Sequence, residues 1–308
     1  MNLATAMPDR AVDVVIVAYR SAASLTSCLR PLLEDPAVRS VVVVDTSDDP
    51  ESRRVVNSAG QGVLYLAFDN VGYGRACNWA ARLGSAEYVV MMNADLVLER
   101  RIGALLPVLG AGVAVAAGHV RTGDVCPSNV KRMSTPLREL QRAFMGSTRT
   151  FGVKARSGAQ MQRCEQLDGA LLALRRDTWI ELGGFDESYE LYYEDVDLCR
   201  RAEVLGGCAV LAGQVGRHEG GASSRQNMAA AYRVRQVSRL RYLRRYHGSV
   251  GSVTALVCTS IDALGRSALG GEEGGRARVS AIRDVLRETL SPGSVWLLVT
   301  PRTIRLDR

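Results

Sequence analysis

Short apolar, β-branched runs alternate with amphipathic segments over the first 118 residues of the chain. Five runs have the length and composition of buried strands, namely Val12–Val17, Val41–Val44, Val63–Leu66, Tyr88–Met92 and Val113–Ala116. Helical periodicity lies between them, at Ala22–Leu33, Gly72–Leu83 and Arg100–Leu109. Continuous apolar strands separated by helices predict a mostly parallel α/β sheet with helices on both faces.

The pattern weakens over residues 119–160, which are rich in Arg, Ser, Thr and Gly. This segment predicts a long loop with one short helix near Pro136–Phe144. Regular patterning returns at Gln166. It predicts two strands, at Leu171–Leu174 and Cys208–Leu211, and three helices, at Arg176–Leu182, from about Glu194 to Leu205, and at Ser224–Tyr246. The helix at Ser224–Tyr246 is long and rich in Arg, and residues 248–308 predict two further helices.

Composition narrows the class of protein. Of the 308 residues 47% are hydrophobic and 23% charged, which is typical of a globular chain. The net charge of +7 favours phosphorylated ligands, an anionic membrane surface or nucleic acid. No basic stretch is interleaved with aromatic residues, so nucleic acid is not an expected partner. No apolar run reaches the ~18 residues that span a bilayer, and no signal-peptide core is expected. The seven scattered cysteines, without a CxxC pair, predict reduced thiols.

Polar residues follow the predicted strands of the first half. Asp45 ends the second run, Asp69 and Asn70 follow the third, and Asn93 and Asp95 follow the fourth. Parallel sheets bind their ligands at the carboxyl ends of the strands. An isolated aspartate after a strand usually caps a turn, but three along one edge give a binding site equal weight.

Two residues offer ligands for a metal ion. A carboxylate such as Asp95 at a strand end can bind a hard divalent cation, which neutralises a diphosphate. His218 follows a predicted strand within a Gly-rich turn, and a neutral imidazole there can complete the same site. Each has a structural alternative, a turn cap for Asp95 and a structural imidazole for His218.

Three acids stand within four residues at the start of a predicted helix, Glu194, Asp195 and Asp197. Capping of the helix N-terminus explains them without any function. Asp197 can also pair with Arg201 one turn further on. The functional interpretation is that one of these acids faces a cleft as a general base and removes the proton of an attacking hydroxyl.

A glycine-rich segment at Asn70–Asn78 superficially matches a dinucleotide-binding fingerprint. Cys77 occupies the third glycine position, and the segment follows the third predicted strand instead of the first. A nicotinamide site is therefore not expected. A glycine-rich helix entry can still accept a phosphate.

In this order the segments resemble glycosyltransferase family 2, and within it the rhamnosyltransferase-like branch. The matching pieces are Val14–Tyr19, Val43–Asp45, Asn70–Gly74, Asn93–Asp95, Asp168–Ala170, Gly183–Glu187, Glu194–Leu198 and His218. The GGFDE sequence at Gly183–Glu187, followed at this spacing by EDVDL at Glu194–Leu198, is the most specific part. The resemblance covers residues 12–225 and leaves residues 226–308 outside it.

The resemblance implies a GT-A fold over residues 1–225, with a nucleotide-binding half at 12–118, an acceptor half at 160–225 and a helical extension at 226–308. It implies that Asp195 is the catalytic base, that Glu194 shapes the acceptor site, and that Asp95 and His218 hold Mg²⁺ or Mn²⁺. The implied nucleotide-binding residues, with the nucleobase near the first two, are Tyr19, Asp45, Asn70, Gly72, Asn93 and Asp95. The chain departs from the family at Arg20 and Thr46, where Asn is usual, and at Asn93, which leaves Asp95 as the only carboxylate of the metal motif.

The implied activity is inverting, metal-dependent sugar transfer from a nucleoside-diphosphate sugar, either dTDP- or UDP-linked, with L-rhamnose from dTDP-rhamnose as the leading donor. The implied acceptor is a lipid-linked, polyprenyl-linked or cell-surface glycan, in cell-wall or polysaccharide synthesis. The alternatives are a non-catalytic protein that binds nucleotide sugars or carbohydrate, and a sugar nucleotidyltransferase, which Ala18–Ala23 disfavours because it lacks a glycine-rich phosphate loop.

We expect a cytoplasmic location. Peripheral contact with the inner face of the plasma membrane, through the Arg-rich helix at Ser224–Tyr246 and the residues beyond it, is one interpretation of the extension. A solvated helix face has equal weight.

Overall fold

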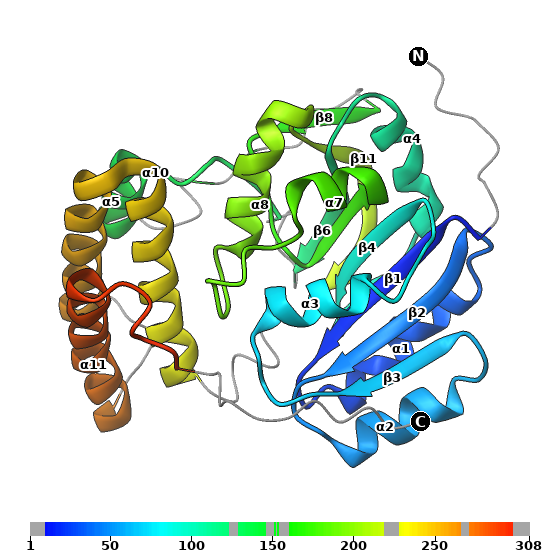
Figure 1. Cartoon of the computed structure of the whole chain (residues 1–308), viewed down its shortest axis with the longest axis horizontal. Helices are drawn as coiled ribbons and strands as arrows, with labels where there is room; N and C mark the ends of the chain where they lie inside the picture. Colours follow the sequence, from blue (N-terminus) through cyan, green and yellow to red (C-terminus); the bar gives the residue numbers. More distant parts are fainter. Residues whose placement is uncertain are drawn as a thin grey trace.

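The computed structural model describes residues 10–122, 129–145, 151, 153, 160–218, 228–265 and 271–297. One mixed sheet runs through the molecule in the order β3-β2-β1-β4-β10-β6-β11-β5, with β8 paired to β11 (Figure 1). Its strands are β1 (Val12–Ala18), β2 (Val38–Asp45), β3 (Val63–Ala67), β4 (Tyr88–Asn93), β5 (Leu96–Leu98), β6 (Val115–Thr122), β8 (Met161–Cys164), β10 (Leu171–Arg175) and β11 (Cys208–His218). A small second sheet pairs β7 (Val130–Lys131) with β9 (Gln166–Leu167).

Helices cover both faces of the sheet and form the C-terminal part of the chain (Figure 1). The first part holds α1 (Ala22–Leu33), α2 (Pro50–Ser58), α3 (Tyr73–Ala81), the 3-10 helix η1 (Ile102–Leu105), α4 (Leu106–Gly110) and α5 (Pro136–Met145). The later part holds α7 (Arg176–Leu182), α8 (Glu194–Ala202), the 3-10 helix η2 (Glu203–Leu205), α10 (Met228–Gly265) and α11 (Gly271–Leu290).

The core explains why the strands read as continuous apolar runs. Along β1, Val14 and Ile16 belong to one buried cluster, which includes the apolar face of α1. Val15, between them, belongs to a second cluster, which includes residues of α3 and α8. Because both faces of the sheet are covered, alternate residues of a strand are equally buried. The expected α/β fold with a mostly parallel sheet is confirmed.

The carboxyl ends of the central parallel strands meet at one edge of the sheet. Ala18 of β1 is in register with Asp45 of β2, and Val17 is in register with Asn93 of β4. β10 runs antiparallel to β4, with Leu171 opposite Met92, so the turn before β10 reaches the same edge. Strand-end residues that are far apart in sequence therefore gather there.

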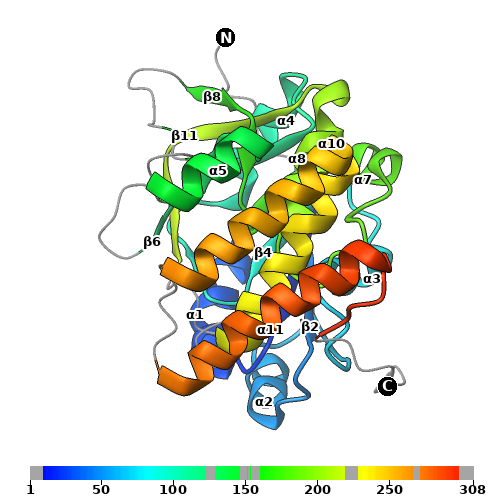
Figure 2. The same ribbon diagram turned by 90° about the vertical axis from the view of Figure 1, so that its left-hand side faces the viewer.

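The C-terminal helices form two layers against this body. At Gly248 the backbone of α10 takes a φ of 56° and a ψ of −136°, a conformation open mainly to glycine, and the helix folds back on itself. The first half packs on the body, where Tyr246 donates a 2.7 Å hydrogen bond to Asp197. The second half lies side by side with α5 and α11 on the outside (Figures 1 and 2).

Several elements differ from the sequence expectations. α2 and β5 were not expected, and β7, β8 and β9 fall where a loop or no element was predicted. The strand expected at Cys208–Leu211 continues to His218, so His218 ends a strand instead of following it in a turn. The expected helix at Ser224–Tyr246 continues through the bend at Gly248.

The proposed domain boundary at residues 225 and 226 lies outside the described residues, so the division stays a prediction. The same holds for the parts of the expected 119–160 loop at residues 123–128, 146–150, 152 and 154–159. Among the described helices, none has a stretch long and apolar enough to cross a bilayer.

Candidate active site

Asp95 and His218 lie together at the carboxyl edge. His218 ends β11 opposite Leu96 of β5, which brings its ring to the turn after β4. Its Nε2 atom lies 2.8 Å from Oδ1 of Asp95 and 3.3 Å from Nδ2 of Asn93. Both Asp95 and His218 side chains are largely buried, with 11% and 16% of their surface exposed. Three predicted site residues thus form one polar cluster.

The chemistry of this cluster fits a divalent cation. Two neighbouring ligands of an octahedral Mg²⁺ lie about 3 Å apart, and the 2.8 Å between Asp95 Oδ1 and His218 Nε2 matches that spacing. A carboxylate oxygen and an imidazole nitrogen also suit Mn²⁺. Among the described residues no group of three or more His, Cys, Asp or Glu side chains could hold a metal. Asp95 and His218 would therefore share the ion with phosphate oxygens, as Mg²⁺ sites commonly do.

Asp195 lies in the first turn of α8 and is held by backbone donors. Its Oδ2 accepts the N–H of Gly169 at 2.9 Å, and its Oδ1 accepts the N–H of Val196 at 2.8 Å. Burial raises the pKa of Asp195 to about 6, and the negative charge of Asp168 raises it further. The two backbone donors and the positive charge of Lys131 act in the opposite direction. A carboxylate with a pKa near 6 is ionised at neutral pH and can still accept a proton.

Hydrogen bonds connect Asp195 to the Asp95 cluster. Gly169, which donates to Asp195, is followed by Ala170, whose carbonyl accepts the N–H of Asn93 at 3.1 Å. The Asn93 side chain in turn contacts His218, which contacts Asp95. A path of short contacts therefore runs from Asp195 across the turn before β10 to Asp95. Residues far apart in the sequence therefore lie at one edge of the sheet, while their catalytic and metal-binding roles stay predictions.

Glu194 is buried and takes no part in the path of contacts described above. It is only 5% exposed, and its Oε2 has no hydrogen-bond partner among the described residues. Burial raises the pKa of Glu194 well above its ordinary value, and the neighbouring Asp195 charge adds to this. A β-carbon added at Gly74 of α3 would contact Glu194 Cβ at 3.6 Å. Glu194 is therefore a buried acid on the α3 side of α8, and its environment favours the protonated form.

Asp45 is fully buried at the end of β2 and its oxygens are already engaged. Oδ1 accepts the N–H and hydroxyl of Ser47, and Oδ2 accepts the N–H of Asp49 and the hydroxyl of Tyr65, all within 2.9 Å. The residue organises the turn after β2. A nucleobase N–H would have to share an occupied oxygen, so the predicted nucleobase role of Asp45 stays a prediction.

Tyr19 and Arg20 lie beside that turn. The guanidinium of Arg20 lies 5.5 Å from the centre of the Tyr19 ring, and the Arg20 N–H donates to Ser47 Oγ at 2.9 Å. Thr46, where the family usually has Asn, uses its hydroxyl on the Ala18 carbonyl at 3.1 Å. Tyr19 and the exposed Arg20 are thus the more open side chains of this corner.

Asn70 and Gly72 shape the entry to α3. Asn70 Oδ1 accepts the Gly72 N–H at 3.3 Å. Gly72 has a φ of 90°, and a β-carbon there would lie 2.4 Å from the Glu190 carbonyl oxygen. Glycine is required at this close approach. The predicted nucleotide-binding role of Asn70 and Gly72 stays a prediction.

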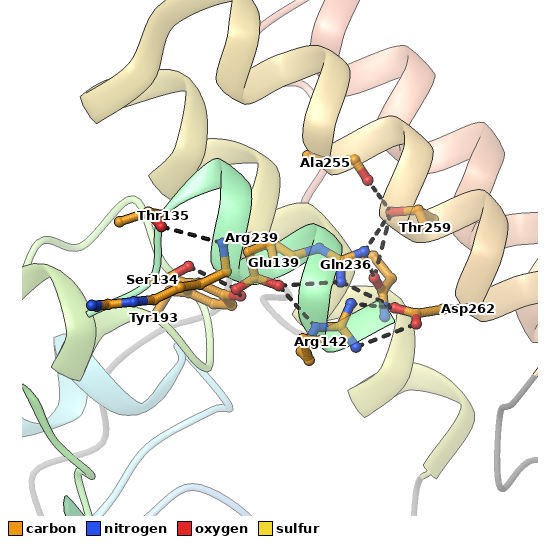
Figure 3. Close-up of polar contacts among 11 residues, drawn as sticks. Ser134, Thr135, Glu139, Arg142, Tyr193, Gln236, Arg239, Ala255, Thr259 and Asp262 are labelled. Atoms are coloured by element: carbon orange, nitrogen blue, oxygen red, sulfur yellow. Dashed lines mark hydrogen bonds and ion pairs between the residues drawn. The ribbon is translucent and has the colours of Figure 1, made fainter. Parts of the chain in front are cut away.

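Sequence reasoning missed the groups that surround the proposed base. Lys131 of β7 lies 2.7 Å from Asp168, and both act on Asp195 through their charge. Tyr193, before α8, donates its hydroxyl to Glu139 of α5 at 2.8 Å, within the polar network of Figure 3. The family match at Asp168–Ala170 pointed to Asp168 without giving it a role. No sequence pattern linked Lys131 to Asp168 or Glu139 to α8.

Residues 13–162 match the family model Glycosyl transferase family 2. No curated protein gives a significant sequence match to the chain. The described fold is similar to that of the mannosyltransferase PcManGT from Pyrobaculum calidifontis in complex with GDP-Man and Mn²⁺, with a TM-score of 0.52, 15% identity, and 92% of this chain and 81% of that chain covered.

Two further solved structures share the fold. GalNAc-T7 with UDP, GalNAc and Mn²⁺ gives a TM-score of 0.54 at 13% identity, over 92% of this chain and 57% of that chain. S. aureus TarS 1-349 in complex with UDP gives 0.50 at 13% identity, over 91% of both chains. At such identities the likeness shows the fold, and the expected GT-A fold is confirmed. With the family match, these findings support a glycosyltransferase.

Proposed function

We propose that this glycosyltransferase is an inverting, metal-dependent enzyme that moves a sugar from a nucleoside-diphosphate donor to a glycan hydroxyl. The observation that carries the proposal is the path of contacts from Asp195 through Gly169 and Asn93 to the pair Asp95 and His218. It brings a proton acceptor and a cation-binding pair to one sheet edge. Neither a turn cap nor a structural imidazole alone requires that arrangement.

The proposed chemistry needs one base. The acceptor hydroxyl attacks the anomeric carbon as the bond to the diphosphate oxygen breaks on the opposite face, and Asp195 takes the hydroxyl proton. Mg²⁺ or Mn²⁺ held by Asp95 and His218 would neutralise charge on the diphosphate. In this proposal Glu194, whose pKa is raised by burial, borders the acceptor side.

The proposed donor and acceptor come from the sequence resemblance. L-rhamnose from a dTDP-linked donor, and a lipid-linked or cell-surface glycan acceptor, rest on the resemblance of the sequence motifs. The similar structures contain GDP-Man and UDP instead. A panel of dTDP-, UDP- and GDP-sugars with Mn²⁺, read by thermal shift, selects the donor. We propose that Tyr19 contacts the nucleobase while Asp45 holds the turn.

Asp195→Asn tests the proposed base. Transfer should fall about 10²–10⁴-fold, the usual contribution of a positioned base, while donor binding measured by calorimetry stays close to that of the parent. Asp177→Asn is the matched control, because the Asp177 side chain is 68% exposed on α7. Transfer by Asp195→Asn at the parent rate would refute the assignment. Donor binding without transfer by the parent, across glycan acceptors, would favour the non-catalytic alternative.

A further inference from the structure

Five of the arginines expected to face lipid have carboxylate partners within the protein. In the first half of α10 they pair with carboxylates of the body, of α11 and of the second half of α10. The pairs are Arg233–Asp284, Arg239–Asp262, Arg241–Glu288, Arg244–Glu288 and Arg245–Asp186. Arg239 and Arg241 are buried in these pairs and are not available to a membrane, whereas Arg235 and Arg245 of the same helix half are exposed. A second surface, with more exposed apolar side chains, lies one layer further out.

The exposed face of α11 is both basic and apolar. Within residues 274–290 its acids are Asp284 and Glu288, which are 3% and 0% exposed and pair with arginines of the first half of α10. Over residues 274–290 no exposed residue is acidic. The exposed side chains are Arg276, Val279, Arg283, Leu286, Arg287 and Leu290. Their spacing of three and four residues places them along one side of the helix.

The second half of α10 adds an uncharged apolar stripe beside α11. Val250, Val253, Val257 and Leu264 are 66%, 62%, 40% and 88% exposed. They too recur at helical spacing on one side. The only charged residue between 249 and 264 is Asp262, which faces inward to Arg239 and Arg142.

α5 completes this surface. Leu137, Phe144 and Met145 are 66%, 65% and 55% exposed, while Glu139 on the same helix is buried. Figure 2 shows α5, the second half of α10 and α11 side by side, facing the viewer. We name these three helices the outer helical layer. Monomeric proteins seldom expose apolar side chains in such a group unless the surface binds something.

We propose that the outer helical layer docks on an anionic lipid bilayer. Apolar side chains with arginines around them, and no exposed acid over residues 274–290 of α11, match the composition of helices that lie in a membrane interface. Each arginine near an anionic surface adds attraction. A second copy of the chain fits less well, because a two-fold contact through this layer would bring α11 arginines against their own copies.

Docking through this layer would bring the proposed acceptor site near the membrane. Glu139, on the inner side of α5, accepts a hydrogen bond from the hydroxyl of Tyr193 (Figure 3). Tyr193 immediately precedes Glu194 and Asp195 in the sequence. One helix therefore separates the docking surface from the start of α8. This link to a lipid-linked acceptor rests on the proposed function, whereas lipid binding itself is measured without any sugar transfer.

Vesicle flotation with the full chain tests the proposal. The chain should float with vesicles of phosphatidylcholine and phosphatidylglycerol at roughly three to one, and much less with phosphatidylcholine alone. Arg283→Glu with Arg287→Glu should weaken binding at least about tenfold. Leu286→Ser with Val253→Ser should weaken it in salt that screens the arginines. The matched control is Arg30→Glu with Arg54→Glu, since these side chains are 80% and 77% exposed on α1 and α2.

The outcomes are distinct. Loss of binding in the outer-layer variants but not in the control, with unchanged circular dichroism, supports the docking surface. Equal loss in the control would mean that net charge alone attracts the chain and would overturn the proposal. So would a parent that ignores anionic vesicles. If that parent forms a dimer by light scattering that Leu286→Ser breaks, the layer is a contact between copies. Absence of transfer activity bears only on the proposed function.

Discussion

The sheet edge and the helical extension hold their carboxylates in opposite ways. At the edge, Asp195 accepts two backbone N–H groups, and burial together with Asp168 raises its pKa to about 6. In the extension, burial alone would raise the pKa of Glu288, but Arg241 and the N–H groups of Gly293 and Val295 lower it below its ordinary value. Asp195 can therefore take up a proton near pH 6, whereas the negative charge of Glu288 is balanced by Arg241.

This difference separates chemistry from architecture within one chain. Glu288 stabilises the stacking of α11 on α10, because both of its oxygens contact Arg241. Both oxygens of Asp195 accept backbone N–H groups, and Asp95 contacts His218; neither carboxylate has a described arginine partner. An arginine-rich sequence therefore does not by itself indicate a binding surface. Whether an arginine is available to a ligand depends on whether a carboxylate of the protein already pairs with it.

The largest expected effect comes from breaking the buried pair in the extension. Glu288→Gln should lower the free energy of unfolding by about 3–5 kcal/mol, because Arg241, only 6% exposed in its side chain, loses its counter-charge. Urea denaturation measures it. Asp195→Asn should cause no such loss, since its ionised form is already disfavoured by burial. An equal loss in both would erase the distinction between the two regions.

The control is a pair of the same kind on the surface. Arg200 and Glu203 lie 3.1 Å apart with side chains 41% and 45% exposed. Glu203→Gln should change the free energy of unfolding by less than about 1 kcal/mol. A loss as large as that of Glu288→Gln would show that burial is not what distinguishes the two pairs.

The sequence predicted the sheet half well because each local signal agreed with the tertiary fold. α1 and α7 begin and end where the periodicity placed them, and the strand-end residues Asp45, Asn93 and Asp95 meet at one edge. The antiparallel insertion of β10 between β4 and β6 was not predictable, because a buried apolar strand reads the same in either direction.

The second expected effect tests the pair at the sheet edge. His218→Ala should weaken Mn²⁺ binding in the presence of UDP by at least the roughly 10–100-fold that loss of a supporting group costs at a metal site. Electron paramagnetic resonance of free Mn²⁺ measures it without any turnover. His247→Ala on α10 is the control and should bind Mn²⁺ as the parent does. Equal affinity in both variants would remove His218 from the proposed site.

The candidate site was predictable only in part. Motif spacing pointed to Asp95, Asp195 and His218, and the structure brings them to one edge. Two further features depend on contacts between distant segments. Gly72 approaches Glu190 closely, and the oxygens of Asp45 are occupied by hydrogen bonds within the protein. The Tyr193–Glu139 bond joins residues 54 positions apart, and no local pattern encodes it.

A smaller effect tests that bond. Tyr193→Phe should lower the free energy of unfolding by about 1.5 kcal/mol, the usual worth of a hydrogen bond to a charged group. Tyr193 stands at the N-cap of α8 with a φ of 67°, and Tyr193→Phe keeps the ring and removes only the hydroxyl. Tyr232→Phe is the matched control, because the Tyr232 hydroxyl has no partner among the described residues. Equal losses would mean that the hydroxyl of Tyr193 stabilises nothing specific.

The smallest effect concerns pH and sharpens the contrast most directly. If Asp195 is the base, kcat/KM should fall as the pH drops through about 6, because protonated Asp195 cannot accept the hydroxyl proton. Asp168 raises that pKa through its charge, so Asp168→Asn should move the acidic limb to lower pH, by less than about one unit. Lys131, freed from its 2.7 Å partner, adds to the same direction. Asp177→Asn should leave the limb in place. A limb that stays fixed in Asp168→Asn, or moves upward, would assign it to another group and leave Asp195 as a helix cap.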